Sequence, residues 1–148
     1  MAEGLTKEIT VHSVEDTWAL AAKIAAKLKP GMVLALQGDL GAGKTTFMQG
    51  LGYALGVRRP ITSPTFTLSM EYPTERFLLV HFDLYRLTGP GDLLNIGYFE
   101  YLEEGAVVAL EWPERAGELL PRDAVRLTFR LTGEESTRKI RIEGLSLE

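Results

Sequence analysis

The feature that most constrains this chain is a glycine-rich segment, GDLGAGKT, at residues 38–45. It meets the pattern G-x-x-x-x-G-K-[ST], because glycines at positions 38 and 43 are followed by Lys44 and Thr45. The apolar run MVLAL at 32–36 predicts a buried strand before it, and residues 45–55 predict a helix after it, closed by Gly56. A glycine-rich turn between a strand and a helix is typical of a loop that binds phosphate groups.

The chemistry of such a loop explains its spacing. Glycines allow backbone N–H groups to turn inward and form a concave anion site, and the following helix directs its positive N-terminal end at the same place. Lys44 would then reach the β and γ phosphates of a nucleotide, and the Thr45 hydroxyl would bind Mg²⁺. The loop itself would contribute Asp39, Gly41, Ala42 and Gly43.

Composition limits what the rest of the chain can be. With 148 residues, 45% of them apolar and 24% charged, the chain fits one globular domain spanning 1–148. Its apolar runs are too short to cross a bilayer, no signal peptide is evident and there are no cysteines, so we expect a cytoplasmic protein with no membrane contact. A net charge of −4 argues against direct binding of nucleic acid.

The last quarter of the chain departs from this acidic balance. Residues 122–141 contain six basic side chains: Arg122, Arg126, Arg130, Arg138, Lys139 and Arg141. A solvated arginine-rich hairpin would explain them, and so would a docking surface for an acidic partner or for RNA.

Apolar periodicity predicts an α/β fold. The expected strands lie at 7–12, 32–36, 66–72, 76–83, 106–110, 124–131 and 137–142. The expected helices lie at 14–28, capped by Ser13, at 45–55, at 96–104 and in a short segment ending at 120, whereas TGPGD at 88–92 is expected to be a loop. A short connection joins the third strand to the fourth, and another joins the last two strands. Such short connections predict antiparallel hairpins. We therefore expect a P-loop NTPase-like mixed β-sheet flanked by helices, with the hairpins towards its edges.

Two apolar runs end in a carboxylate. LLVHFD ends in Asp83, and VVALE ends in Glu111. A P-loop NTPase needs an acidic residue at the end of a neighbouring strand to orient Mg²⁺ or its water. Either residue could bind the metal, which would leave the other to position the attacking water.

Other polar residues allow two interpretations. Hydroxyls at Thr62, Ser63, Thr65 and Thr67 fall where many P-loop proteins place a nucleotide-sensing switch, although polar turn residues around a proline would look the same. We interpret His81 as a packed strand residue rather than a catalyst. Trp112 could stack on a nucleotide base or pack against the core.

Four motifs together resemble one family. GDLGAGKTT at 38–46, SPTF at 63–66, HFDLYR at 81–86 and EWPER at 111–115 have the order and spacing of the TsaE (YjeE) family, over most of the chain. The first motif is generic, whereas the other three in combination are specific to that family.

This resemblance implies an ATPase that is required for the threonylcarbamoyladenosine (t6A) modification at position 37 of tRNAs reading codons that start with A. It implies ATP or ADP and Mg²⁺ as ligands, a TsaB–TsaD pair as partner, tRNA as an indirect partner through that complex, and weak hydrolysis alone. By motif, Lys44, Thr45 and Thr46 would bind phosphate and Mg²⁺. Asp83 and Glu111 would surround the metal and the water, and Thr65 would lie in the switch-like region. Arg86 would support this site or contact a partner.

Two other functions share the phosphate-binding loop. A small-molecule kinase would need an acceptor pocket and usually a mobile lid, and the segment 88–92 is short and contains no arginine. A nucleotide-dependent binding switch would need no meaningful hydrolysis. The absence of an Asn-Lys-x-Asp or Thr-Lys-x-Asp motif favours adenine over guanine as the base.

Overall fold

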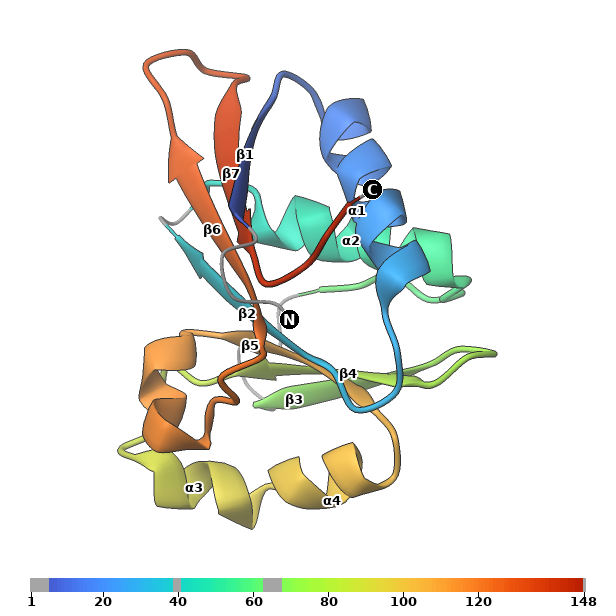
Figure 1. Cartoon of the computed structure of the whole chain (residues 1–148), viewed down its shortest axis with the longest axis vertical. Helices are drawn as coiled ribbons and strands as arrows, with labels where there is room; N and C mark the ends of the chain where they lie inside the picture. Colours follow the sequence, from blue (N-terminus) through green and yellow to red (C-terminus); the bar gives the residue numbers. More distant parts are fainter. Residues whose placement is uncertain (1–5, 39–40, 63–67, 148) are drawn as a thin grey trace.

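A computed structural model of the chain describes residues 6–38, 41–62 and 68–147. In these residues seven strands form one sheet, in the order β1-β7-β6-β2-β5-β4-β3 (Figure 1). The strands are β1 (Thr6–Val11), β2 (Val33–Gly38), β3 (Ser69–Pro73), β4 (Leu78–Asp83), β5 (Val107–Glu111), β6 (Val125–Leu131) and β7 (Arg138–Glu143).

The centre of the sheet is parallel and its flanks are antiparallel. Strand β2 pairs in parallel with both β5 and β6, and β4 pairs in parallel with β5. The β3–β4 and β6–β7 pairs are antiparallel hairpins, and β1 adds antiparallel to β7. The prediction of a mixed sheet with hairpins towards its edges is confirmed.

Helices cover both faces of this sheet (Figure 1). On one face lie α1 (Val14–Lys27) and α2 (Lys44–Leu55), and on the other lie α3 (Pro90–Asn95), α4 (Tyr98–Glu103) and the 3₁₀ segment η1 (Pro113–Leu119). In β5 the side chains alternate between the two cores, because Val107 and Ala109 join the α1–α2 cluster while Val108 and Leu110 join the opposite one. A strand covered on both sides has no polar alternation, which explains its wholly apolar sequence.

The predicted signals at the ends of α1 and α2 are present. Ser13 has extended backbone, and its hydroxyl accepts a hydrogen bond from the Asp16 N–H at 3.0 Å, as an N-cap should. Gly56 closes α2 in the left-handed conformation, with φ +84°. None of the helices in the described ranges is both long and apolar enough to span a membrane.

The predicted loop at 88–92 is wrong in part, because α3 begins at Pro90 within it. Proline fits the first turn of a helix, where its missing N–H has no partner to lose. Asp92 connects this turn to Thr88, which lies before the helix. Its carboxylate accepts hydrogen bonds from the backbone N–H and the hydroxyl of Thr88 at 2.9 and 2.8 Å. Smaller differences lie at element ends, where β4 starts two residues later than predicted and the short helix ending near 120 is a 3₁₀ segment.

Candidate functional site

The loop after β2 begins at a glycine that the sheet itself requires. Gly38 pairs with Phe129 of β6, and a Cβ added to Gly38 would lie 2.1 Å from the Phe129 carbonyl oxygen. Farther along the loop, Gly41 and Gly43 have φ values of +79° and +109°, which favour glycine. Asp39 lies outside the described residues, so its predicted contact with phosphate stays a prediction.

Lys44 starts α2 and turns back over the loop. Its Nζ donates a hydrogen bond to the Gly38 carbonyl oxygen at 3.1 Å. Beyond it, Thr45 is exposed and Thr46 is half-buried, while Ala42 is fully buried in the core. The Lys44 ammonium, the glycine-rich loop and the N-terminus of a twelve-residue helix therefore meet at one end of α2, which is an arrangement suited to an anion.

The two candidate carboxylates lie side by side. Asp83 and Glu111 are paired in register at the ends of the parallel strands β4 and β5. On the same strand faces, Leu79 of β4 and Ala109 of β5 belong to the α1–α2 core. Because side chains alternate along a strand, both carboxylates project on the face that carries α2. The Asp83 carboxylate also accepts a hydrogen bond from the Tyr85 N–H at 3.0 Å.

Glu111 has a buried partner that the sequence interpretation missed. Nε2 of His81, itself only 1% exposed, lies 2.7 Å from Oε2 of Glu111. Burial alone would raise the pKa of Glu111, but the interaction with His81 and the positive charge of Lys44 outweigh it, so the pKa lies below its ordinary value. Glu111 is therefore a carboxylate at neutral pH. His81 does pack within the strand, as expected, but against this carboxylate rather than against apolar side chains alone.

Trp112 lies beside Lys44 rather than inside the core. Its side chain is 39% exposed, and its ring centroid lies 5.7 Å from the Lys44 ammonium and 4.9 Å from the ring of Tyr85. Its backbone is left-handed, with φ +57° and ψ +53°, which is uncommon for a bulky residue. Residues with unusual backbone conformations occur often at functional sites, and Trp112 directly follows Glu111.

A hollow of about 210 Å³ adjoins the other side of the loop. Its wall combines the end of β1, the start of α1, the loop and the β6–β7 turn: Val11, Ser13, Val14, Thr17, Gly41, Gly43, Thr46, Ser136 and Arg138. Arg138 Nε lies 3.4 Å from the Gly41 carbonyl oxygen, which it approaches as a donor. The sequence gave this arginine no special role within the basic cluster, since only the pairing of β7 with β1 brings it to the loop.

Other basic residues of that cluster lie on the surface of the sheet. Arg130 and Lys139 lie 3.0 and 3.9 Å from the carboxylate of Glu8, and Arg141 lies 3.6 Å from that of Glu143. Their side chains are about half exposed, so these ion pairs contribute little to stability.

The donor set suits Mg²⁺ bound together with phosphate. In the part of the chain that the structure describes, no three His, Cys, Asp or Glu side chains cluster in a way that could hold a metal. Mg²⁺ typically takes only one or two protein carboxylates and completes its shell with phosphate oxygens and waters. The pair of Asp83 and Glu111, in register at the ends of neighbouring strands, fits that pattern. Of the switch-like hydroxyls, Thr62 is exposed, while Ser63, Thr65 and Thr67 lie outside the described residues.

This fold and this loop together define a P-loop protein. The family model for the threonylcarbamoyl adenosine biosynthesis protein TsaE matches residues 11–140. The chain is 44% identical over 140 residues to the tRNA threonylcarbamoyladenosine biosynthesis protein TsaE of Aquifex aeolicus, a match that covers 93% of this chain and 96% of the relative. It is 40% identical over 121 residues to the Bacillus subtilis TsaE protein, covering 82% of this chain and 75% of the relative.

A solved structure shows the same architecture. The crystal structure of Bacillus subtilis YdiB superposes with a TM-score of 0.80 at 33% identity, over 96% of this chain and 87% of that one. The chain belongs to the TsaE family, whose members serve in the biosynthesis of threonylcarbamoyladenosine in tRNA. The resemblance of the four sequence motifs and the predicted α/β fold are both confirmed.

Proposed function

We propose that this protein is a Mg²⁺-dependent ATPase that supports t6A modification at position 37 of tRNA by acting with a TsaB–TsaD pair. The observation that carries the proposal is the in-register pairing of Asp83 and Glu111 on the face of the sheet that holds α2. Two carboxylates beside a phosphate-binding loop are what ATP hydrolysis needs to hold a metal and align water.

Each residue of the site has a distinct task in this proposal. Lys44 exchanges its bond with the Gly38 carbonyl for the β and γ phosphates, and the loop N–H groups hold the same phosphates. Thr45, Asp83 and Glu111 hold Mg²⁺ and orient the attacking water. When bound, Mg²⁺ supplies positive charge that balances the charge on the phosphate oxygens.

His81 acts on this site through Glu111. With Nε2 at 2.7 Å from one carboxylate oxygen, His81 fixes the orientation of the side chain and leaves the other oxygen free for a ligand or water. Buried partners of this kind commonly hold metal ligands in place. His81 is therefore a positioning residue, and Glu111 is the group that meets the metal or the water.

The hollow of about 210 Å³ beside the loop is suited to the nucleoside. It adjoins Gly43 and Thr46, at the end of the loop away from Trp112, and offers both apolar and polar walls. Arg138 would contact the sugar or the first phosphate there. Trp112, close to Lys44, would contact the terminal phosphates or a partner at the opposite end, rather than the base.

Hydrolysis by the isolated chain should be slow. Rapid phosphoryl transfer usually requires additional positive charge on the γ-phosphate, often an arginine from a second protein. We expect the TsaB–TsaD surface to supply or order that charge.

The test is hydrolysis of ATP and GTP by the purified chain with Mg²⁺, with and without the TsaB–TsaD pair, and with Lys44→Ala as control. We expect weak ATP turnover that rises at least tenfold with the pair and disappears in the variant. Turnover that is indifferent to the pair would contradict partner activation. Phosphorylation of an added metabolite would favour a kinase, and full t6A formation with Asp83→Ala would favour a binding switch that does not hydrolyse ATP.

A further inference from the structure

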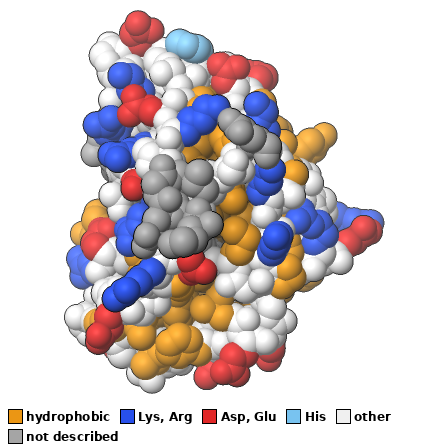
Figure 2. All heavy atoms as spheres, viewed as in Figure 1, with side chains coloured by type: hydrophobic (Ala, Val, Ile, Leu, Met, Phe, Trp, Pro, Cys, Tyr) orange, Lys and Arg blue, Asp and Glu red, His pale blue; other side chains and the backbone are white. Residues whose placement is uncertain are grey.

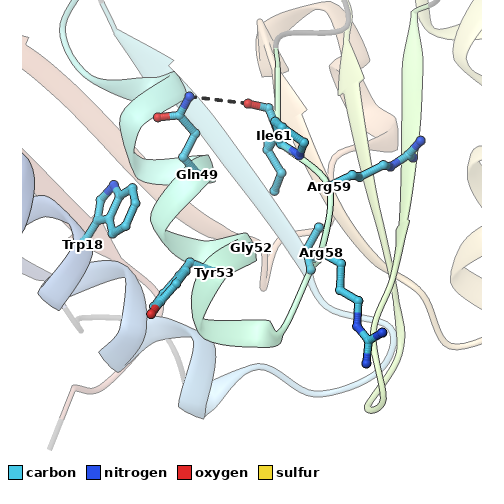
Figure 3. A pocket seen from close by; sticks show the side chains of 9 residues that line it. Trp18, Gln49, Gly52, Tyr53, Arg58, Arg59 and Ile61 are labelled. Carbon is cyan, nitrogen blue, oxygen red and sulfur yellow. Dashed lines mark hydrogen bonds between the residues drawn. The ribbon is translucent and has the colours of Figure 1, made fainter.

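A second hollow, of about 430 Å³, lies over the outer side of α2 (Figure 3). Its floor is α2 itself, at Gln49, Gly52 and Tyr53. Trp18 of α1 forms one wall, and the extended segment 57–61 forms the other. Gln49 links floor and wall, since its Nε2 donates to the Ile61 carbonyl oxygen at 3.5 Å. The hollow belongs to the helix that starts at Lys44, but it lies farther along that helix than the phosphate site.

Two glycines of α2 bring these walls close to the helix. A Cβ at Gly50 would lie 2.8 Å from the Trp18 ring, and a Cβ at Gly52 would lie 2.2 Å from the Ile61 side chain. Glycine is unfavourable inside a helix, so its presence at both positions needs a reason in packing. The reason here is the close approach of both walls, which makes the hollow a built feature of the fold.

An aromatic pair borders the hollow on the solvent side. The rings of Trp18 and Tyr53 stack with centroids 5.5 Å apart and planes 27° apart. Tyr53 remains 75% exposed, although its ring is mostly apolar. Exposed, rigid aromatic side chains beside a pocket are the residues that most often supply binding energy at protein interfaces.

Two arginines lie on the side of this pocket opposite Trp18 (Figure 3). Arg58 and Arg59 are exposed and line it, and together with Arg76 they also line an adjoining hollow of about 780 Å³ beside the β3–β4 hairpin. Among the described residues, none of the three forms an ion pair with a carboxylate. Figure 2 shows basic side chains next to hydrophobic ones on this side of the molecule. Arg76 is engaged with the end of α1, since it donates to the Ala25 and Leu28 carbonyl oxygens at 2.7 and 2.6 Å, and Glu75 also lines the adjoining hollow. Arg58 and Arg59 are the exposed cations of the aromatic pocket itself, on a chain of net charge −4.

We propose that this groove is the docking site for an acidic segment of a partner protein, which inserts one bulky apolar side chain against Trp18 and Tyr53 and places carboxylates near Arg58 and Arg59. Charge complementarity selects the acidic sequence, and the aromatic pocket selects the anchor. RNA fits less well, because three cations on an acidic protein make a small site for a phosphate backbone. The proposal rests on the proposed function for the identity of the partner, the TsaB–TsaD pair.

The test measures affinity of the full chain for the purified TsaB–TsaD pair by titration calorimetry. Tyr53→Ala and Arg58→Glu alter the groove at exposed side chains, and Leu131→Ala and Arg126→Glu are matched exposed controls on β6. We expect each groove variant to weaken binding at least tenfold, while the controls remain within twofold of wild type. Affinity of the isolated chain for ADP should not change in any of the four, which separates docking from nucleotide binding.

Three results would overturn the proposal. Groove variants that bind the pair as tightly as wild type would place the interface elsewhere, with the proposed function intact. Weaker binding of tRNA by the groove variants, with unchanged binding to the pair, would assign the groove to RNA. Wild-type protein that does not bind the pair at all would refute the partner in the proposed function, and with it the occupant named here.

Discussion

His81 of β4 and Glu111 of β5 meet inside the protein, with Nε2 of the histidine 2.7 Å from Oε2 of the carboxylate. The two residues are thirty positions apart, and only the parallel register of the two strands brings them together. The contact fixes the buried end of Glu111 at the edge of the sheet where the phosphate-binding loop leaves β2. In the proposed function Glu111 meets a metal or water on one side, and His81 holds it from the other.

This contact predicts how two substitutions at His81 should differ. His81→Leu removes the partner of a buried carboxylate, and we expect kcat for ATP hydrolysis in the presence of TsaB–TsaD to fall about 10- to 100-fold. His81→Gln places an amide N–H near the position of Nε2, so it should recover much of that loss. The affinity for ATP without metal should change little in either variant, because His81 is buried and acts through Glu111.

A second measurement separates positioning from general damage. Binding of Mn²⁺ in the presence of ADP, followed by electron paramagnetic resonance, should weaken in His81→Leu and recover in His81→Gln. Equal loss in both variants, or loss of kcat without any change in metal binding, would contradict the positioning role of His81.

Gly38 provides a prediction about stability. Because a Cβ at Gly38 would lie 2.1 Å from the Phe129 carbonyl oxygen, Gly38→Ala must separate β2 from β6 or distort the start of the loop. We expect the free energy of unfolding to fall by about 2–3 kcal/mol, measured by urea denaturation without nucleotide. Gly133→Ala is the matched control, since its added Cβ meets no atom within 4 Å. Similar stability of the two variants would show that the strands can move apart at little cost.

Arg138 tests the assignment of the nucleoside pocket. If its guanidinium contacts the sugar or the first phosphate, Arg138→Ala should weaken ADP binding about tenfold, the equivalent of roughly 1.4 kcal/mol. Arg141→Ala, three residues on, removes an arginine that forms a surface ion pair with Glu143, and it should leave ADP affinity unchanged. Calorimetric titration with ADP measures both. Equal affinities would place the nucleoside outside the hollow beside the loop.

The sequence was sufficient for the framework of the site because each signal was local. The spacing of Gly43, Lys44 and Thr45 identifies the loop, and apolar runs identify the strands that end in Asp83 and Glu111. Parallel strands that are covered on both faces place their carboxyl ends at one edge of the sheet. The proximity of these groups can therefore be predicted before the strand register is known.

Contacts between distant segments could not be predicted in the same way. The partner of Glu111 depends on strand register, and the approach of Arg138 to Gly41 depends on the order of β1, β7 and β6. The start of α3 was missed for a different reason, since the Gly- and Pro-rich segment 88–92 predicts a loop, whereas Pro90 occupies the first turn of a helix.

Gly50 offers the sharpest test of the packing between α1 and α2. In an open helix, replacing glycine by alanine stabilises a protein by roughly 0.5–1 kcal/mol. Gly91 of α3 meets that condition, because a Cβ there has no neighbour within 4 Å, and Gly91→Ala should raise the free energy of unfolding. At Gly50 the Cβ would lie 2.8 Å from the Trp18 ring and 3.0 Å from the Trp18 Cα, which cannot move without shifting α1. Gly50→Ala should therefore lower the free energy of unfolding by about 1–3 kcal/mol. Urea denaturation of the two variants should give changes of opposite sign, and stabilisation by both would mean that α1 yields easily and that the wall formed by Trp18 is not fixed by the glycine.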